Sequence, residues 1–375
     1  MVFTLEALQA FWGDCLIVHA GPAADPRLLL IDGGPTATYE TSLKPRLEEL
    51  RAARGGGPLT LDMVLVSHID GDHIQGIIRL AAAQIAAGEP TVDVRTLWHN
   101  AFDDVLGNRA QELEDANDRG QLEGAHHDVE AVIASVPEGR VLRDHASKLR
   151  WKLNRPVDGL VTVERAAAPV AVADQVELTV VAPAQPQLDA LYETWERWLK
   201  NAKLDPVQPA TVTDSSVFNR SSIVLLLKAG QRTMLLTGDA RGDHVTAGLD
   251  RIGAARNGVT EVDLLKLPHH GSVRNIDEEF FERVRARHYV ISANGRFGNP
   301  DQATLDMLPR VRTDDDWVLH LTNGDGTGPD GSSLKDRLAT WLDTLRAQGR
   351  RFEVRTRAED ELGVRIDLGE PLPSP

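Results

Sequence analysis

The stretch Leu65–Gly76, LVSHIDGDHIQG, joins an apolar strand to a helix through a turn that is crowded with potential metal ligands. The four potential ligands are His68, Asp70, Asp72 and His73. So many carboxylates and imidazoles in one turn repel or desolvate one another unless a cation organises them, and Gly71 allows the turn to fold tightly enough for them to converge. The alternative is an acidic helix cap, in which Asp72 only stabilises the start of the helix.

Two further apolar strands end in potential ligands. Thr233–Thr237 leads to Asp239, and Val262–Leu267 leads to the tandem histidines His269 and His270. An aspartate after a glycine is commonly a turn residue, but two histidines in tandem after a buried strand are harder to explain as structural. Because ligands gather beyond the carboxyl ends of strands, we expect the three segments to form one site.

The composition fits one large α/β domain. The chain has 375 residues, 42% of them hydrophobic, and its 41 basic and 56 acidic residues give a net charge of −15. This net negative charge disfavours nonspecific electrostatic binding of nucleic acid over a large surface, although bound divalent cations would make the charge of the site locally positive. Cys15 is the only cysteine, which excludes an internal disulfide and a thiolate zinc cluster. No apolar run is long enough for a membrane span, and Glu6 and Asp14 interrupt any signal peptide, so we expect a cytoplasmic protein without a membrane partner.

Apolar runs alternate with helical patterns along the chain. The expected strands are Thr4–Ala7, Cys15–Ala20, Arg27–Asp32, Met63–Ser67, Val94–Trp98, Leu160–Val163, Val176–Val181, Ser222–Lys228, Thr233–Thr237, Val262–Leu267, His288–Ser292 and Trp317–Leu321. The expected helices are Tyr39–Arg54, His73–Ala87, Leu188–Lys200, His244–Ala255, Glu278–Arg285 and Ser333–Gln348. We expect a single domain over residues 1–368, with a helical insertion at 101–155 and a loose tail at 369–375.

In their order along the chain, several of these segments resemble the metallo-β-lactamase fold. The resemblance is to the branch that contains the hydrolase domain of the competence channel ComEC and its stand-alone relatives. The matching segments are Gly13–Cys15, Leu30–Gly34, His68–His73, Asn219–Ile223, Leu236–Asp239, Pro268–Ser272 and Ser292–Gly295. Each segment alone is a weak signal, and their shared order is a strong one. The resemblance implies an α/β fold, namely an αββα sandwich with two metals at the sheet edges.

The resemblance also implies a role for each ligand. The implied ligands are His68 and Asp70 for the first metal, Asp72 and His73 for the second, and Asp239 as the bridge. Either His269 or His270 would complete the second site, and we expect His269 because it lies closer to the strand end. The candidate catalytic residues are Asp72 and Asp239.

Three departures from the family pattern affect these expectations. The wider fold carries histidine at the position of Asp70, whereas the ComEC-like branch also has aspartate there. This harder ligand favours manganese over zinc. We therefore expect two divalent cations, manganese in preference to zinc, with magnesium as a further alternative. No third histidine follows for the first metal, and Asn299 stands where ComEC-like relatives often have histidine before proline. The other histidines that we considered for the first metal are His99, His126, His127 and His145.

Further side chains are expected to brace the ligands or to face the substrate. Asp32 would brace the ligand loop, a role that often matters nearly as much as ligation. The others are Asp14, Asn100, Asn219, Ser222, Lys266 and Asn294. Arg274 and Arg296 lie just beyond the candidate segments and would either meet a phosphate group or remain solvated surface charges.

The resulting functional hypothesis is phosphodiester hydrolysis by a hydroxide held between two cations, with nucleic acid as one candidate substrate. The first alternative is hydrolysis of a small ester, lactone or thioester by the same metals, which the acidic surface favours over long nucleic acid. The second alternative is a catalytically degenerate metal-binding sensor or interaction module, suggested by the missing third histidine and by Asn299. The fold alone does not decide among them.

Overall fold

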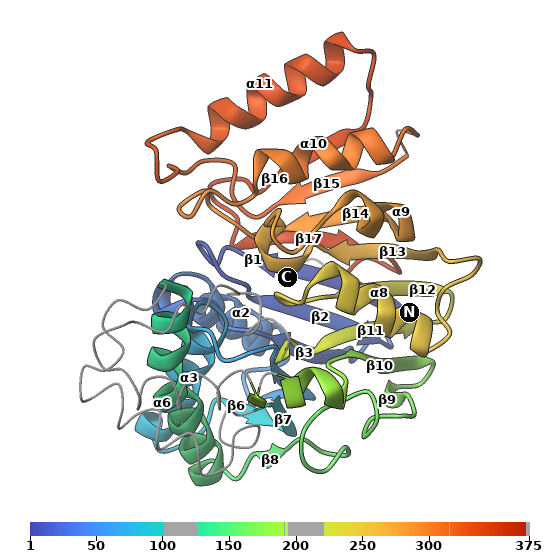
Figure 1. The fold of residues 1–375 in the computed structure, drawn as a ribbon. Helices are drawn as coiled ribbons and strands as arrows, with labels where there is room; N and C mark the ends of the chain where they lie inside the picture. The colour runs from blue at the N-terminus through green and yellow to red at the C-terminus, as the bar shows by residue number, and fades with distance from the viewer. Residues whose placement is uncertain (101–126, 191, 194–220, 315, 373–375) are drawn as a thin grey trace, which may run out of the picture.

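The chain forms a sandwich of two large β-sheets with helices on both outer faces, as the sequence predicted (Figure 1). The computed structural model describes the chain except for residues 101–126, 191, 194–220, 315 and 373–375. A sheet buries apolar side chains on both of its faces only if it is covered on both sides. In the strands Arg27–Ile31 and Met63–Val66, every residue except Arg27 is buried.

The first sheet has seven strands in the order β17-β1-β2-β3-β5-β7-β8. Their bounds are β1 Val2–Leu8, β2 Leu16–Gly21, β3 Arg27–Ile31, β5 Met63–Val66, β7 Thr96–His99, β8 Lys152–Leu153 and β17 Gly363–Asp367. Strands β1, β2 and β3 form an antiparallel meander, and β3, β5, β7 and β8 run parallel. The carboxyl ends of β3, β5 and β7 therefore lie at one edge of this sheet.

The second sheet has eight strands in the order β16-β15-β14-β13-β12-β11-β10-β9. Their bounds are β9 Val170–Ala173, β10 Val176–Ala182, β11 Val224–Ala229, β12 Arg232–Leu236, β13 Thr260–Lys266, β14 Val284–Ile291, β15 Val318–Leu321 and β16 Glu353–Thr356. Strands β12 to β16 run parallel. A small separate sheet pairs β4, Leu59–Leu61, with β6, Val92–Val94.

The described helices fall into two groups, one on each sheet. The helices beside the first sheet are α1 Thr36–Thr38, the π-helix η1 Tyr39–Leu43, α2 Lys44–Ala53, α3 Gly71–Ala87 and α6 His127–Lys148. Those beside the second are α8 Gly242–Arg251, α9 Glu278–Arg283, α10 Gln302–Val311 and α11 Leu334–Ala347, with the short 3-10 helix η3 at Pro268–Gly271. Figure 1 shows α3 and α6 together on one side of the molecule and α10 and α11 at its far end. Among the described residues, no helix combines the length and apolar character that a bilayer span requires.

Three apolar cores follow from this layering. Leu65 and Met234 belong to the core between the two sheets. Val64, the strand neighbour of Leu65, belongs instead to the core under α2 and α3, and Leu235 belongs to the core under α8 to α11. Because successive residues of a strand point to opposite faces, this alternation fixes each sheet between two apolar layers. The ligand segments then emerge from rigid strands.

The structure departs from the sequence-based elements in three ways. Leu160–Val163 was expected as a strand but belongs to neither sheet, and the backbone of Val161 is bonded to the side chain of Asn100. The expected strand Val94–Trp98 is divided between β6 and β7, which belong to different sheets. The sequence patterns did not identify β4, β9, α10, β16 or β17, nor β8, which lies inside the expected helical insertion 101–155. Most of the expected helix Leu188–Lys200 and all of the Pro-containing segment 204–213 lie outside the described residues.

The carboxyl-terminal strand closes the first sheet. β17 pairs antiparallel with β1, with Thr4 opposite Asp367. Beyond it, the backbone N–H of Glu370 donates to the Met1 carbonyl at 3.0 Å, and the Glu370 carboxylate lies 2.7 Å from the Met1 amino group. The first residues of the expected loose tail are thus bonded to the amino terminus.

Candidate metal centre

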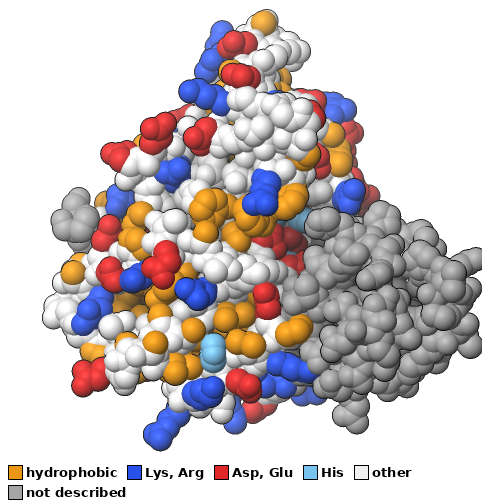
Figure 2. Space-filling model, turned by 90° about the vertical axis from the view of Figure 1, so that its left-hand side faces the viewer, with side chains coloured by type: hydrophobic (Ala, Val, Ile, Leu, Met, Phe, Trp, Pro, Cys, Tyr) orange, Lys and Arg blue, Asp and Glu red, His pale blue; other side chains and the backbone are white. Residues whose placement is uncertain are grey.

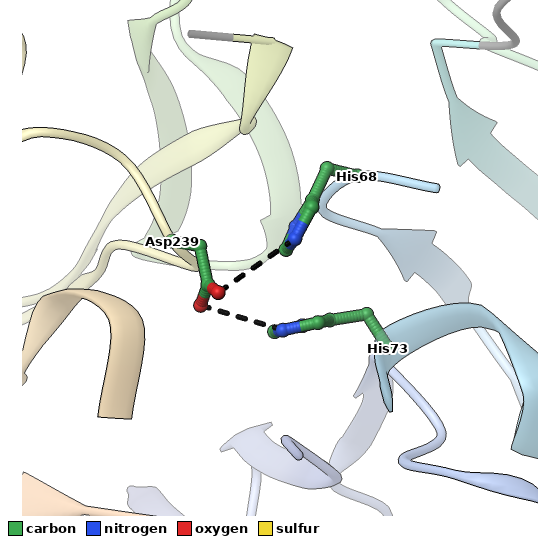
Figure 3. A group of neighbouring side chains, drawn as sticks. All are labelled: His68, His73 and Asp239. Carbon is green, nitrogen blue, oxygen red and sulfur yellow. Dashed lines mark ion pairs between the residues drawn. The ribbon is translucent and has the colours of Figure 1, made fainter. Parts of the chain in front are cut away.

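The carboxyl ends of strands from both sheets bring the predicted ligands together. The turn after β5 and the first turn of α3 carry His68, Asp70, Asp72 and His73. Asp239 follows β12 of the second sheet, and the tandem histidines follow its parallel neighbour β13. Figure 3 shows His68 and His73 directed at the carboxylate of Asp239. The site therefore lies where the two sheets meet.

The two oxygens of Asp239 face different sets of nitrogen atoms. Its Oδ1 lies 3.3 Å from Nε2 of His73 and 3.6 Å from Nε2 of His270. Its Oδ2 lies 3.5 Å from Nε2 of His269 and 3.8 Å from Nε2 of His68. The carboxylate thus stands between two groups of ligand atoms, which is the position that a bridging residue needs.

On the Oδ1 side, the ligand atoms form a closed ring. Oδ2 of Asp72 lies 3.4 Å from Nε2 of His270 and 3.9 Å from Nε2 of His73. The ligand atoms of these three residues all lie within 4.8 Å of one another. We call Asp72, His73 and His270 the compact half of the centre.

On the Oδ2 side, the ligand atoms form an open chain. Oδ2 of Asp70 lies 3.6 Å from Nε2 of His68, but among the described residues no group of three mutually close ligand atoms includes Asp70 or His269. We call His68, Asp70 and His269 the open half. The two halves share Asp239 and differ in how closely their own ligand atoms approach one another.

Both histidines of the compact half are anchored through Nδ1. His73 Nδ1 donates to Oδ2 of Asp32 at 2.9 Å, and His270 Nδ1 donates to the carbonyl of Ser292 at 2.8 Å. A carboxylate and a carbonyl only accept hydrogen bonds, so the neutral imidazole carries its proton on Nδ1. Nε2 then presents its lone pair to the centre, as second-sphere hydrogen bonds arrange in metal sites.

The open half is anchored in the same way through different partners. His269 Nδ1 donates to Oδ1 of Asn275 at 2.7 Å. His68 Nδ1 lies 3.0 Å from Oγ of Ser67, and that hydroxyl in turn donates to Asp32 Oδ2 at 2.7 Å. Asp32 therefore braces both halves. It holds His73 of the compact half directly, and it holds Ser67, the partner of His68, through the hydroxyl and through the backbone N–H at 2.7 Å.

The tandem histidines are separated by an unusual backbone. His269 and His270 have φ of 46° and 55°, and Gly271 follows at 82°. A left-handed conformation costs a residue other than glycine roughly 1–2 kcal/mol. It turns the two rings 73° apart, so that the side chain of His270 is 3% exposed and that of His269 is 31% exposed. The geometry places His270, and not the expected His269, in the compact half.

Buried atoms without hydrogen-bond partners converge on the centre of the site. Among the described residues they include Nε2 of His68, His73 and His270, together with Oδ1 of Asp239. A buried polar atom left unpaired costs about 1–3 kcal/mol. Several such atoms with lone pairs at one point indicate that the protein is arranged to hold an electron-pair acceptor there.

The raised pKa values of two histidines also indicate that the site attracts positive charge. Burial alone would lower the pKa of His73, but the negative charges of Asp239 and Asp32 raise it well above its usual value. Burial also opposes protonation of His270, whose pKa Asp239 and Asp14 nevertheless raise to about 9. The carboxylates thus attract positive charge, which bound divalent cations would supply in place of protons.

Asp14 and Lys266 form a fully buried ion pair beside the compact half. Oδ1 of Asp14 also lies 3.5 Å from His270 Nδ1, and its backbone N–H donates to the Asp72 carbonyl at 3.2 Å. Burial alone would raise the pKa of Asp14, but the positive charge of Lys266 together with His270 lowers it well below the usual value. Both residues, which the sequence indicated as bracing or substrate-facing, form part of the wall of the site.

Other expected site residues have more distant positions. Asn100 is bonded through its amide to the backbone of Val161 and clamps a loop. Ser222 lies buried beneath Gly238, and Asn294 accepts from the backbone N–H of Arg296 at 3.1 Å. Asn219 lies outside the described residues, as does His126. None of the groups of converging ligand atoms in the described part contains His99 or His145.

Sequence reasoning missed three anchoring residues and a contact from helix α6. Ser67, Asn275 and Ser292 anchor imidazoles, and only Ser67 lies in a segment that the patterns singled out as ligand-rich. Glu138 of α6 accepts a hydrogen bond from Gln75 at 2.9 Å. Burial raises the pKa of Glu138, and the hydrogen bond from Gln75 only partly offsets this. Helix α6 thus places a carboxyl group near the start of α3.

Part of the chain is similar to known proteins of one superfamily. Residues 23–155 match the family model of the Metallo-beta-lactamase superfamily. ComE operon protein 3 of Bacillus subtilis is 32% identical over 113 residues, which are 28% of this chain and 14% of that relative. The chain thus spans only a small part of this relative's length. The solved structure of the metallo-beta-lactamase fold protein YhfI from Bacillus subtilis is 13% identical, with a TM-score of 0.41 over 97% of this chain and 99% of that one. The structure of unliganded yeast PDE1 is 11% identical, with a TM-score of 0.42 over 96% of this chain and 98% of that one.

Proposed function

We propose that this chain, which is a metallo-β-lactamase-fold protein and a ComEC-like relative, is a phosphodiesterase that uses two divalent cations. Members of this superfamily are mostly metal-dependent hydrolases. One observation carries the proposal for this chain. Four imidazoles, each anchored through Nδ1, direct Nε2 towards the two oxygens of Asp239.

The spacing of the ligand atoms fits metal coordination. Two ligands about 2.0–2.2 Å from one tetrahedral ion lie roughly 3.3–3.6 Å apart. In the compact half, Nε2 of His270 lies 3.4 Å from Asp72 Oδ2 and 3.6 Å from Asp239 Oδ1. In the open half, His269 lies 3.5 Å from Asp239 Oδ2, and His68 lies 3.6 Å from Asp70.

This spacing supports a ligand set that differs from the expected one. His270 would complete the compact half, and His269 would supply the open half with the histidine that the sequence comparison lacked. Each cation would then have two imidazoles, one carboxylate of its own and one oxygen of Asp239. Nitrogen and oxygen ligands suit both zinc and manganese, and the carboxylate share favours manganese.

The side chains around the cations have distinct tasks. When bound, the two cations would lower the pKa of a water molecule and stabilise the departing oxygen of the substrate. Asp239 fixes the separation of the two ligand groups, and Asp32 holds both the loop and His73 in orientation. Lys266 compensates the buried charge of Asp14, which keeps that carboxylate beside His270 without a proton.

The open half is where a substrate would enter. His269 is 31% exposed at the side chain, whereas its counterpart His270 in the compact half is 3% exposed. The two aspartates are exposed to similar extents, Asp70 to 24% and Asp72 to 22%. A phosphodiester presents charged oxygens to such a partly exposed, oxygen-rich pair of cations. Nucleic acid is one candidate within this class.

A substrate panel tests the proposal. Purified protein is stripped with chelator and reloaded with manganese or zinc, and bound metal is counted by mass spectrometry. We expect two cations per chain and turnover of bis(p-nitrophenyl) phosphate. Single-stranded DNA and a set of lactones and thioesters are assayed in parallel.

Each other result selects a different function. Turnover of a lactone or thioester with all phosphodiesters intact would replace the proposal by the small-ester hydrolase. Fewer than one bound cation per chain under saturating manganese would favour a non-catalytic binding module. With His269 as a ligand, the open half would have the second histidine that the sequence lacked, which would weaken the main reason for that last alternative.

A further inference from the structure

A cluster of two aromatic rings and one arginine lies at the surface next to the metal centre. The guanidinium carbon of Arg296 lies 4.1 Å from the centre of the Trp12 ring and 5.5 Å from that of Phe297. The two rings meet edge to face, 5.8 Å apart and at 89°. We call Trp12, Arg296 and Phe297 the aromatic–arginine cluster.

Two of the three side chains of this cluster are exposed, and Trp12 is half-buried. Phe297 is 55% exposed, the largest value among the exposed large hydrophobic residues of the described chain, and Arg296 is exposed as well. In Figure 2, hydrophobic side chains and a basic one lie together near the middle of the face, beside acidic side chains and a histidine. Burial therefore does not explain the position of Phe297.

The Trp12 side of the cluster adjoins the compact half through the backbone. Gly13 packs so closely on α3 that a Cβ there would lie 1.9 Å from the Asp72 carbonyl oxygen. The next residue, Asp14, is part of the wall of the site. Consecutive Cα atoms are about 3.8 Å apart, so the Cα of Trp12 lies within about 8 Å of that of Asp14.

The Arg296 side adjoins the same half through the loop after β14. Ser292, at the start of this loop, donates from Oγ to the Gly13 carbonyl at 2.6 Å and accepts from His270 Nδ1 at 2.8 Å. Asn323 joins the two sides, because its amide donates to the carbonyls of Phe11 at 3.4 Å and Ala293 at 3.1 Å. The cluster thus rests on the same hydrogen bonds that orient a ligand histidine.

Hydrogen bonds from helix α11 fix the loop that carries Arg296 and Phe297. Arg337 of α11 donates to the carbonyls of Gly298 at 3.2 Å and Pro300 at 2.8 Å. A surface held in this way is preorganised, so a ligand that binds to it loses little freedom to ordering of the protein. The rings are therefore available as a fixed platform.

Arg296 has no carboxylate partner among the described residues. Its backbone N–H donates to Oδ1 of Asn294 at 3.1 Å, and its guanidinium lies over the Trp12 ring and near the Phe297 ring. A guanidinium stacked on an aromatic ring keeps its N–H edge free to bind phosphate oxygens. A simple surface cation–π contact is worth only about 0.5–1 kcal/mol, and it does not require an exposed second ring beside a ligand loop.

We propose that the aromatic–arginine cluster binds a nucleobase and a neighbouring phosphate of a single-stranded nucleic acid whose phosphodiester lies at the metal centre. This inference rests on the proposed phosphodiesterase function and names its substrate class. Bases stack on exposed aromatic side chains, and a duplex hides the base faces that such a platform needs. With a net charge of −15, the chain has little general attraction for nucleic acid, and local stacking supplies it instead.

A competition assay on the metal-loaded full chain tests the inference. Hydrolysis of methyl p-nitrophenyl phosphate is inhibited with oligothymidylate, with an abasic strand of equal length and with a duplex. We expect oligothymidylate to inhibit more strongly than the other two. Trp12→Ala should weaken inhibition by oligothymidylate about 5- to 100-fold and leave the abasic strand unchanged, since one stacked base contributes about that much.

Matched variants separate stacking from charge and from folding. Trp12→Phe should restore most of the discrimination, and Arg296→Gln should weaken binding of both single strands and lower their salt dependence. Ile85→Ala removes another exposed hydrophobic side chain, and Arg256→Gln another exposed arginine; neither should change inhibition.

The outcomes distinguish this inference from the function beneath it. Equal inhibition by oligothymidylate and the abasic strand in the unchanged protein, or an unaltered ratio in Trp12→Ala, would overturn the platform while leaving the phosphodiesterase intact. If no phosphodiester is hydrolysed, the proposed function fails. Anisotropy of the labelled strands then measures base-dependent binding directly, and its absence would reject the platform as well.

Discussion

The compact and open halves of the candidate metal centre use the same side-chain types but hold them differently. Each half has two histidines and one aspartate and shares Asp239. In the compact half, His73 is anchored by a buried carboxylate and His270 by a buried backbone carbonyl. In the open half, His269 is anchored by Asn275, a neutral amide, and is partly exposed.

The difference follows from the elements that carry the ligands. Asp72 and His73 belong to the first turn of α3, a helix of 17 residues that packs on the first sheet. Asp70 precedes that helix with an extended backbone, and nothing in the helical hydrogen-bond ladder fixes its side chain. Preorganised ligands bind a cation without ordering cost. We therefore expect the compact half to bind the tighter cation and the open half to exchange its cation and meet the substrate.

The largest effect should come from the residue that the two halves share. Asp239→Asn keeps the shape of the side chain but removes the negative charge at the centre. We expect both cations to be lost and hydrolysis to fall by about 100-fold or more, beyond the 10–100-fold effect of losing an outer partner. Metal content by mass spectrometry and turnover of bis(p-nitrophenyl) phosphate measure this. Retention of two cations with full activity would remove Asp239 from the centre.

Replacing the tandem histidines one at a time should separate the halves. His270→Ala should remove the tight cation, and His269→Ala should remove only the weak one, because each Nε2 faces a different oxygen of Asp239. Calorimetric titration of the stripped protein with manganese should then show one surviving site in each variant, of high affinity only in His269→Ala. Equal losses in the two variants would show that the halves are not distinct.

The anchoring residues allow a smaller and more selective test. Asp32→Asn weakens the partner of His73, whereas Asn275→Ala removes the partner of His269. Outer partners typically alter metal affinity by 10–100-fold. We expect Asp32→Asn to weaken both sites, because Asp32 also holds Ser67, and Asn275→Ala to weaken the open half alone. A weakened tight site in Asn275→Ala would contradict the division.

The sequence alone predicted some features of the fold and of the candidate site but not others. Each candidate ligand segment follows an apolar strand, so the patterns pointed to Asp239 and to the turn after β5 as parts of one cluster, which the structure brings together. The family order supplied the sandwich. The choice between His269 and His270 depends on two consecutive left-handed residues, which histidine rarely adopts and which no sequence pattern signals. Anchors such as Ser292 come from distant segments and depend on tertiary contacts. Strand β17 was missed for the same reason, since its pairing with β1 joins the two ends of the chain.

The smallest expected effect is on stability. A cation that binds only the folded chain stabilises it by RT ln(1 + [L]/Kd), or about 2.7 kcal/mol at a hundredfold excess over Kd. For a chain of this size we expect a rise in melting temperature of a few degrees, nearly complete after the first equivalent of manganese because the compact half fills first. His269→Ala should keep most of this rise, and His270→Ala should lose it. A rise that grows equally with both equivalents would mean that both halves hold their cations with similar strength, and that the exposure of His269 does not weaken binding.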